Sequence, residues 1–207
     1  ALNAERVEIY SDVDGIANCD PRQISVASFM DTISAAQILS MANEGSSVIH
    51  PRAVKASLKT KTPIVARNTF SNAAGTIIFH HESANQSEQV TLAHRENMAL
   101  IVFENATDAQ RLVPEMIPID ECRFLIKNDI YLENSLKLLK TSLGTLKLEE
   151  GWSTISVVFD KSAEESINVP QTEIIPSSNN VICYLLKEDR LEVSLQLLYD
   201  HYLLKSQ

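Results

Sequence analysis

Glycine is scarce in this chain, and its scarcity excludes two common kinds of phosphate-binding loop. Only five glycines occur among 207 residues: Gly15, Gly45, Gly75, Gly144 and Gly151. None lies in a G-x-G-x-x-G or Walker-type spacing, in which glycines allow the backbone to approach a phosphate closely. The sequence therefore contains neither a dinucleotide-binding fingerprint nor a P-loop.

Cysteine is also sparse, which bears on metal binding and on the redox environment. Cys19, Cys122 and Cys183 are odd in number and far apart, so they form neither a C-x-x-C motif nor a disulfide framework. The adjacent His80 and His81 have no supporting cluster of ligands, which favours a solvated pair over a metal site. No apolar run approaches the ~20 residues that span a bilayer. We therefore expect a cytoplasmic protein with no metal site of its own and no membrane contact.

Positive charge is in deficit. Lys and Arg total 18 against 27 Asp and Glu, which gives a formal net charge of −9 and a pI near 5.0. Such a chain repels a phosphate backbone, so general nucleic-acid binding is excluded as a function class. The length allows one large domain or two small ones.

An internal repeat organises the second half of the chain. Residues 132–139 and 191–198 are identical at six of eight positions, and each carries leucines at helical spacing. Upstream, 124–129 resembles 184–189, Val113-Pro114 resembles Val169-Pro170, and 99–104 resembles 155–160. Each copy predicts strand, short polar helix, strand, strand and a longer amphipathic helix. We therefore expect two tandem α+β units of the βαββα type, at residues 93–151 and 152–207, after a polar linker over 81–92.

Residues 1–80 predict an α/β segment that is too short to close its own sheet. Strands are expected at 7–10 and 63–67, with a helix from Asp31 to Asn43 and another over 52–61. Asp12 and Asp14 follow the first strand at its carboxyl end, where open α/β sheets place ligands. The two carboxylates could hold Mg²⁺ or a ribose hydroxyl, and a plain polar turn is the alternative. Arg22 offers a guanidinium suited to phosphate, or else a surface ion pair.

Three ordered motifs resemble the aspartate kinase family. Residues 9–22, Ile-Tyr-Ser-Asp-Val-Asp-Gly-Ile-Ala-Asn-Cys-Asp-Pro-Arg, are similar to its nucleotide-binding strand and loop. Residues 45–52, Gly-Ser-Ser-Val-Ile-His-Pro-Arg, are similar to its G-A-K-V-(L/I)-H-P-R segment, and 63–70, Pro-Ile-Val-Ala-Arg-Asn-Thr-Phe, to the segment that closes the kinase domain. In that family two ACT modules, which are regulatory βαββα units, follow the kinase domain. The repeat found above lies where they would be.

The resemblance implies the carboxyl-terminal half of a kinase that transfers the ATP γ-phosphoryl group to L-aspartate, at the entry to lysine, threonine and methionine biosynthesis. Ser11 and Asp12 would contact the nucleotide, Arg22 its adenosine or phosphate side, and Val48 would line the pocket by its backbone, with Mg²⁺ as the accompanying ion. Ser47 occupies the position of the family's lysine in this segment. The family pattern also implies a homodimer through the ACT-like modules.

Departures from the family pattern bear on activity and on effector binding. Ser47 removes a positive charge where phosphate charge would be met, and Ala17 replaces an aromatic residue that packs on the base. The family's amino-terminal K-F-G-G-(T/S) and central G-R-G-G-S-D segments are absent from these residues, so we expect the missing amino-terminal kinase segment to be needed for catalysis. The turns at 104–108 and 160–164 lack the family's effector-binding glycines, which predicts weakened effector binding.

Three functions stay open at this point. The first is the regulatory segment of an active aspartate kinase. The second is a catalytically degenerate homologue that serves as a regulatory or dimerisation module. The third is a free-standing amino-acid sensor, which the missing glycines disfavour.

Overall fold

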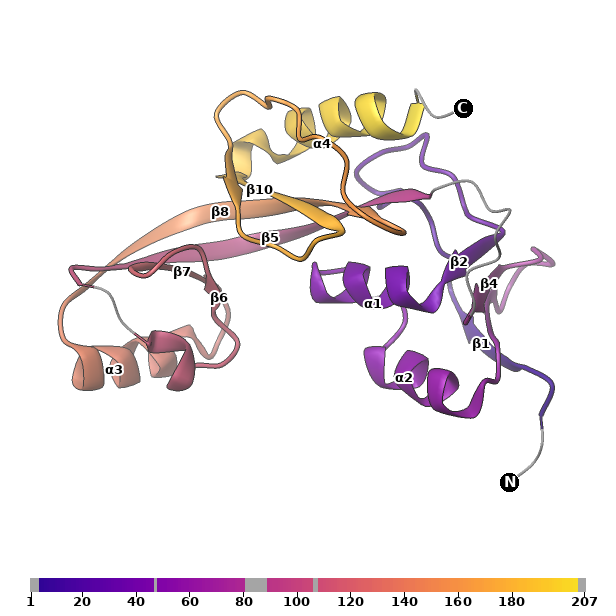
Figure 1. Ribbon diagram of the computed structural model, residues 1–207, viewed down its shortest axis with the longest axis horizontal. Coiled ribbons are helices and arrows are strands. Elements are labelled where there is room, and N and C mark those ends of the chain that lie inside the picture. The colour runs from indigo at the N-terminus through magenta and orange to yellow at the C-terminus, as the bar shows by residue number, and fades with distance from the viewer. Residues whose placement is uncertain (1–3, 47, 81–88, 106–107, 205–207) are drawn as a thin grey trace.

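The computed structural model describes residues 4–46, 48–80, 89–105 and 108–204. They form a four-stranded and a six-stranded sheet (Figure 1). The four-stranded sheet and its helices comprise β1 (Val7–Ser11), β2 (Thr32–Ser34), α1 (Ala35–Asn43), α2 (Pro51–Thr60), β3 (Ile64–Asn68) and β4 (Thr76–Phe79). The strand order is β1-β3-β4-β2, with β1 parallel to β3, β2 parallel to β4, and β3 antiparallel to β4.

The first helix begins later than expected, because a short strand precedes it. We expected Asp31 to cap this helix, but Ser34 is the N-cap, and its hydroxyl accepts a hydrogen bond from the Gln37 amide at 3.0 Å. Residues 32–34 instead pair with β4, which the sequence pattern did not reveal. The second helix begins as expected, because Pro51 occupies its first turn and His50 caps it.

The six-stranded sheet takes its strands and helices from the rest of the chain. These are β5 (Val90–Phe103), β6 (Ile117–Pro118), β7 (Arg123–Lys127), α3 (Leu132–Leu143), β8 (Leu146–Phe159), β9 (Glu173–Ile175), β10 (Val181–Lys187) and α4 (Leu191–Tyr199). The order is β6-β7-β5-β8-β10-β9, so the long first strands of the two sequence repeats, β5 and β8, pair at the centre. Residues 81–88 of the expected linker lie outside the described residues.

The longer helix of each repeat is confirmed, whereas the shorter one is not. Between β5 and β6 the described residues of the first copy form only a 3₁₀ turn, at Ala109–Arg111, and residues 160–172 of the second copy contain no helix. In the second copy, tyrosine side chains hydrogen-bond backbone groups that a helix would otherwise pair. The Tyr184 hydroxyl bonds both the amide and the carbonyl of Ile167, and the Tyr202 hydroxyl donates to the Glu165 carbonyl. The short helices predicted for both copies were therefore wrong.

Two irregularities in the central strands divide the six-stranded sheet into halves with separate cores. The β5–β8 register shifts on both sides of Met98, where Asn97 has a φ of 55°, and Gly151 on β8 has a φ of 75°. One cluster packs under α3 around Leu139 and a second packs under α4 around Leu198. Figure 1 shows these two helices at different ends of the long β5–β8 ribbon.

A third cluster joins the two sheets. It contains Ile38 and Met41 of α1 together with Val158 and Val181 of the six-stranded sheet, all of them buried. Helix α1, which belongs to the four-stranded sheet's part of the chain, therefore packs directly onto the six-stranded sheet.

Candidate functional site

The carboxyl ends of two parallel strands bring Ser11 and Asp12 to the segment that follows β3. Ser11 pairs with Asn68 in the β1–β3 register, and the Ser11 carbonyl accepts from the Thr69 amide at 2.8 Å. The side-chain amide of Asn68 donates to the main-chain oxygen of Asp12 at 3.4 Å and to Asp14 Oδ1 at 2.8 Å. The resemblance named Ser11 and Asp12 from one segment, and the structure adds Asn68 as the residue that holds their loop.

Asp14 is the best-supported carboxylate of this loop. Its Oδ1 accepts from the Ser71 hydroxyl at 2.6 Å as well as from Asn68. These two hydrogen bonds, Ser71 first, lower the pKa of Asp14 below its usual value. Asp14 is thus ionised at neutral pH, while the neighbouring Asp12 is exposed to solvent.

Within the described residues, this loop has two carboxylates that could bind the Mg²⁺ of a magnesium–nucleotide complex. It does not have a complete set of protein ligands for the ion. Across residues 4–46, 48–80, 89–105 and 108–204, no group of three or more His, Cys, Asp or Glu side chains is placed to hold a metal ion. Mg²⁺ in phosphoryl-transfer sites is commonly bound through one or two carboxylates and the phosphates of the substrate. Asp12 and Asp14 fit that requirement.

Arg22 lies in a surface ion pair. Its guanidinium bonds both carboxylate oxygens of Asp20, with the shortest contact at 2.6 Å, and its side chain is 89% exposed. The Arg22 guanidinium is the main cause of the lowered pKa of Asp20, and Asp20 in turn raises the pKa of Arg22. A surface ion pair is one of the two roles that the sequence context of Arg22 allowed.

The turn after α1 carries the other predicted nucleotide residues. Ser47 lies outside the described residues, and Val48 is partly exposed beside a narrow gap lined by Ile16 and Met41. Gly45, with a φ of +105°, lies against β5, where an added Cβ would come within 2.6 Å of the His94 carbonyl oxygen. The turn therefore needs glycine at this position for both its conformation and its close approach to β5.

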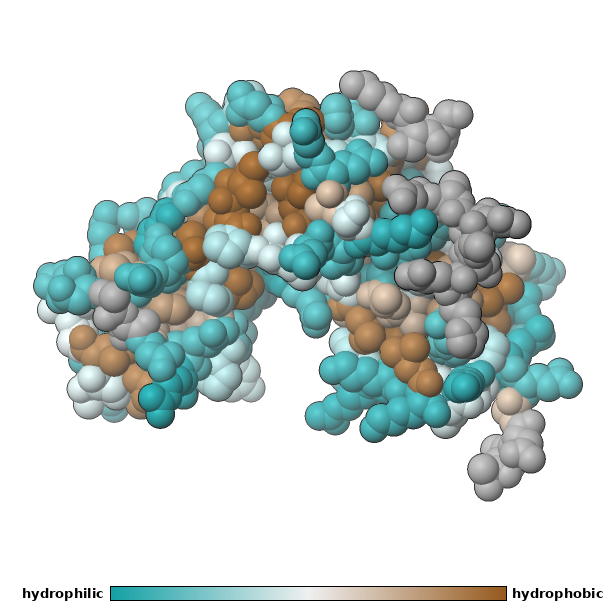
Figure 2. Space-filling model, in the orientation of Figure 1, coloured by the Kyte–Doolittle hydropathy of each residue, from teal (hydrophilic) through white to brown (hydrophobic). Residues whose placement is uncertain are grey.

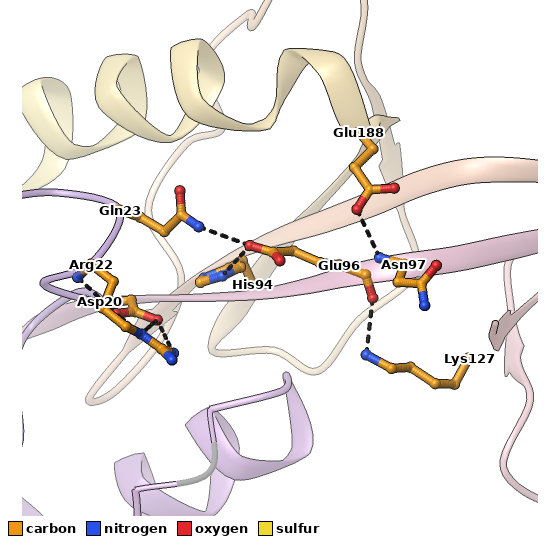
Figure 3. Close-up of polar contacts among 8 residues, drawn as sticks. All are labelled: Asp20, Arg22, Gln23, His94, Glu96, Asn97, Lys127 and Glu188. Carbon is orange, nitrogen blue, oxygen red and sulfur yellow. Dashed lines mark hydrogen bonds and ion pairs between the residues drawn. The ribbon is translucent and has the colours of Figure 1, made fainter. Parts of the chain in front are cut away.

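Contacts between the loop after β1 and the six-stranded sheet were missed at the sequence level. The Leu92 amide on β5 donates to the Asn18 carbonyl at 2.8 Å, and the Gln23 side chain donates to Glu96 at 2.9 Å (Figure 3). Near the end of the loop, the Tyr199 hydroxyl of α4 donates to the Val26 carbonyl at 2.9 Å. These partners are far apart in sequence and share no motif, so no sequence signal could have found them.

A polar stripe on α1 was also missed, although its spacing was visible. Ser34, Gln37, Ser40 and Glu44 recur at intervals of three or four residues, and each hydrogen-bonds the six-stranded sheet or the residues next to it. Ser34 donates to Asp160 at 2.6 Å, and Glu44 accepts from Ser156 at 2.7 Å. A helix face of this kind indicates a polar interface with another element of the same chain.

An open hollow of about 380 Å³ lies beside residues 94–96 of β5. Gly45, Arg95, Glu96, Glu115 and Lys127 line it, so charges of both signs face the hollow. In the view of Figure 2 the molecule is deeply notched between the part that contains α3 and the part that contains α2.

Within the described residues, no helix has both the length and the apolar character that a membrane span needs.

Comparison with known proteins identifies the relatives of this chain. Residues 1–68 match the model of the amino acid kinase family. Aspartokinase 1 of Bacillus subtilis is 36% identical over 90 residues, which cover 44% of this chain and 22% of that protein. Aspartate kinase of Pseudomonas fluorescens is 24% identical over an alignment that covers 96% of this chain and 57% of that protein. The chain therefore spans less than two thirds of the length of either relative.

The fold agrees with these matches. The structure of Escherichia coli aspartokinase III in complex with aspartate and ADP has a TM-score of 0.74 and 19% identity, and the match covers 97% of this chain and 53% of that one. The amino-terminal segment is similar to the amino acid kinase family over the residues that its model matches. The chain as a whole is a relative of the aspartokinases and aligns with their carboxyl-terminal half.

Proposed function

We propose that this chain is the carboxyl-terminal, regulatory segment of an aspartate kinase, which phosphorylates the side-chain carboxylate of L-aspartate with ATP. One observation carries the proposal. Two segments that resemble the family's nucleotide-binding elements, residues 9–22 and 45–52, reach β5 of the six-stranded sheet: Asn18 accepts from the Leu92 amide, and a Cβ added at Gly45 would come within 2.6 Å of Arg95 Cγ. A regulatory sheet in direct contact with nucleotide-binding segments is suited to control them.

In this proposal Ser11, Asp12, Arg22, Ser47 and Val48 contact the nucleotide, and Mg²⁺ binds between its phosphates and the Asp12 loop. Catalytic groups come from an amino-terminal kinase segment. The exposed edge strand β1 supports this arrangement, because Val7 and Tyr10 are 45% and 54% exposed and β1 is paired with β3 on one side. Parallel strands are normally covered on both faces and flanked by further strands, so β1 is suited to receive another strand.

A catalytically degenerate homologue, acting as a regulatory or dimerisation module, is the second candidate. Two features favour it: Ser47 replaces the family's lysine, and the Arg22 guanidinium is already paired with Asp20. Both reduce the positive charge available to phosphate, on which phosphoryl transfer depends.

Nucleotide binding and turnover separate the two candidates. With the amino-terminal kinase segment present, titration calorimetry with Mg-ATP would measure nucleotide binding, and a coupled ADP-release assay would measure aspartate phosphorylation. Wild type and Ser47→Lys are compared, with Lys55→Ser on α2 as a matched surface charge change. Normal turnover by wild type would rule out the degenerate candidate. Absence of ATP binding in both wild type and Ser47→Lys would rule out the enzyme.

The assembly is proposed to be a cytoplasmic homodimer formed through the ACT-like modules. The edge strands β6 and β9 and the outer face of α4, where Val193 is 60% exposed, are the surfaces available for it. Light scattering at tens of micromolar protein should give twice the chain mass of 23.0 kDa, and a monomeric mass would contradict the proposal.

A further inference from the structure

A short stretch of β5, residues 92–96, contacts both candidate nucleotide segments. At one end, the Leu92 amide donates to the Asn18 carbonyl at 2.8 Å. At the other end, Glu96 Oε1 accepts from Gln23 Nε2 at 2.9 Å and from His94 Nε2 at 3.1 Å (Figure 3). The loop at 18–24 is thus fixed to β5 at two points.

Arg95 holds the other candidate segment, the turn after α1, from the opposite side of β5. Its Nη1 lies 3.1 Å from Glu44 Oε2, and its other terminal nitrogen donates to the Asn43 carbonyl. The Arg95 and Glu44 side chains are only 17% and 15% exposed, so water screens this ion pair little. Gly45 follows directly, and a Cβ added there would come within 2.6 Å of Arg95 Cγ and of the His94 carbonyl oxygen.

The same stretch of β5 is tied to distant parts of the six-stranded sheet. Lys127, at the end of β7, donates to the Glu96 carbonyl at 3.1 Å. The next residue, Asn97, has a φ of 55° at the register shift, and its amide donates to Glu188, just before α4, at 3.2 Å. Hydrogen bonds from the end of β7 and from the residues just before α4 thus reach β5 directly beside Arg95 and Glu96.

We infer that Arg95 and Glu96 are positioning residues that set the loop at 18–24 and the turn at 43–46 relative to each other. Because successive side chains of a strand point to opposite faces, one strand can hold one segment on each face. This inference rests on the proposed nucleotide-binding function, since it deepens the account of that site. Neither residue is assigned a contact with the nucleotide.

Hydrogen exchange on the intact chain tests the mechanical part of the inference. Glu96→Ala should speed exchange of amides in residues 18–24, and Arg95→Ala should speed exchange in residues 43–46. Glu96→Gln keeps an oxygen acceptor for Gln23 and should stay close to wild type, and Arg95→Lys keeps the charge opposite Glu44 if the alanine variant does not fold. Arg123→Ala is the matched control, because Arg123 is a strand arginine with two carboxylate partners, Asp120 and Glu173.

ATP affinity, measured with the amino-terminal kinase segment present, tests the functional part. Loss of one such hydrogen bond should raise the Kd for Mg-ATP about three- to tenfold in Glu96→Ala and Arg95→Ala. Glu96→Gln and Arg123→Ala should remain within about twofold of wild type.

The outcomes separate the two claims. Unchanged exchange in both segments would overturn the positioning role, whether or not the chain binds ATP. Faster exchange with an unchanged Kd would overturn it as well, because the residues would then hold the segments without effect on the site. Faster exchange together with a higher Kd supports the inference. Faster local exchange in a chain that binds no ATP even as wild type would overturn the proposed nucleotide function, and with it the functional half of the inference, while supporting the mechanical half.

Discussion

The side-chain amide of Gln37 on α1 donates to the main-chain oxygen of Gln89, 3.1 Å away, at the residue that leads into β5. Gln37 is fully buried, and its nitrogen also lies 3.4 Å from the Val158 carbonyl on β8. Its amide oxygen, in contrast, is buried without a hydrogen-bond partner within the described part of the chain. Gln37 thus stands at the centre of the interface between the two sheets, with only half of its amide satisfied.

Substitutions of Gln37 should separate the effects of hydrogen bonding and of charge. The Gln89 and Val158 carbonyls have other donors, the Asp160 amide and the Thr91 hydroxyl, so Gln37→Met leaves neither carbonyl unpaired and removes the orphan oxygen. We expect Gln37→Met to change the free energy of unfolding by less than about 1 kcal/mol, whereas Gln37→Glu should lower it by about 3 kcal/mol or more at pH 7, because a buried carboxylate would lack a cationic partner. Urea denaturation measures both variants. Equal losses would contradict this account.

Acid should destabilise the fold through two arginine-paired aspartates. The Arg22 guanidinium lowers the pKa of Asp20, and the Arg123 guanidinium, helped by the Cys122 amide, lowers the pKa of Asp120. A carboxylate with a depressed folded pKa adds stability above its unfolded value of 3.8, and this stability is lost as the pH falls through the lower folded value.

Neutral variants test that pH dependence. Asp20→Asn and Asp120→Asn should be less stable than wild type at pH 7 and should lose less stability between pH 5 and 3, in urea titrations at a series of pH values. Glu133→Gln, on the exposed surface of α3, serves as the control and should follow wild type. A steeper acid loss in the asparagine variants would show that the sign of the shift is wrong.

Alanine at Gly45 should cost more than alanine at another glycine with positive φ. Gly45 and Gly151 have φ values of +105° and +75°, so both substitutions introduce backbone strain. At Gly45 the new methyl would also lie 2.6 Å from the His94 carbonyl, whereas at Gly151 no atom lies within 4 Å. We expect Gly45→Ala to melt roughly 3 °C or more below Gly151→Ala, since about 1 kcal/mol shifts the melting temperature of a chain of this size by 2–4 °C. Equal melting temperatures would show that β5 can move away from the turn.

The three cysteines should differ in reactivity in the folded chain. Burial raises the pKa of the Cys19 thiol to about 12 and that of Cys183 to about 11, so neither forms a thiolate at pH 8. Cys122 is partly exposed. A short treatment with iodoacetamide at pH 8 should therefore modify Cys122, and peptide mass spectrometry would identify it; urea should expose the other two. Rapid native modification of Cys19 would mean that the loop at 18–24 opens readily from β5.

Local pattern predicted the elements whose own side chains decide their structure. Leucine spacing predicted α3 and α4, and in the folded chain Leu132, Leu139, Leu191 and Leu198 are buried as that spacing requires. The beginning of α1 was not predictable, because Asp31 and Ser34 are both good capping residues and pairing with β4 selects the second. The segment at 160–172 fails as a helix because distant tyrosines bond its backbone, which no local rule describes.

The candidate site, too, was predictable only where neighbouring residues determine its structure. The motif at residues 11–14 predicted a polar loop at the end of β1, and the parallel β1–β3 pair brings Asn68 to it. The role of Arg95 and Glu96 could not be predicted, because their partners lie 51 and 73 residues away and follow no shared pattern. Long-range contacts of this kind are set by how the two sheets pack.

Lysine or threonine should not stabilise this chain. After β8, where the family carries a glycine-rich turn, the Asp160 side chain instead accepts from Ser34 at 2.6 Å, and the Ala163 amide is already bonded to the Asn179 carbonyl at 3.0 Å. An acidic side chain and an occupied amide leave little to bind the carboxylate of a free amino acid.

A ligand at a hundred times its Kd stabilises the folded state by about 2.7 kcal/mol, which would raise the melting temperature by roughly 5 °C or more. We therefore expect no shift at 10 mM of either amino acid in a thermal scan, with glycine at the same concentration as the control for solute effects. A reproducible rise of several degrees with lysine or threonine alone would show that one of the repeats retains an effector site.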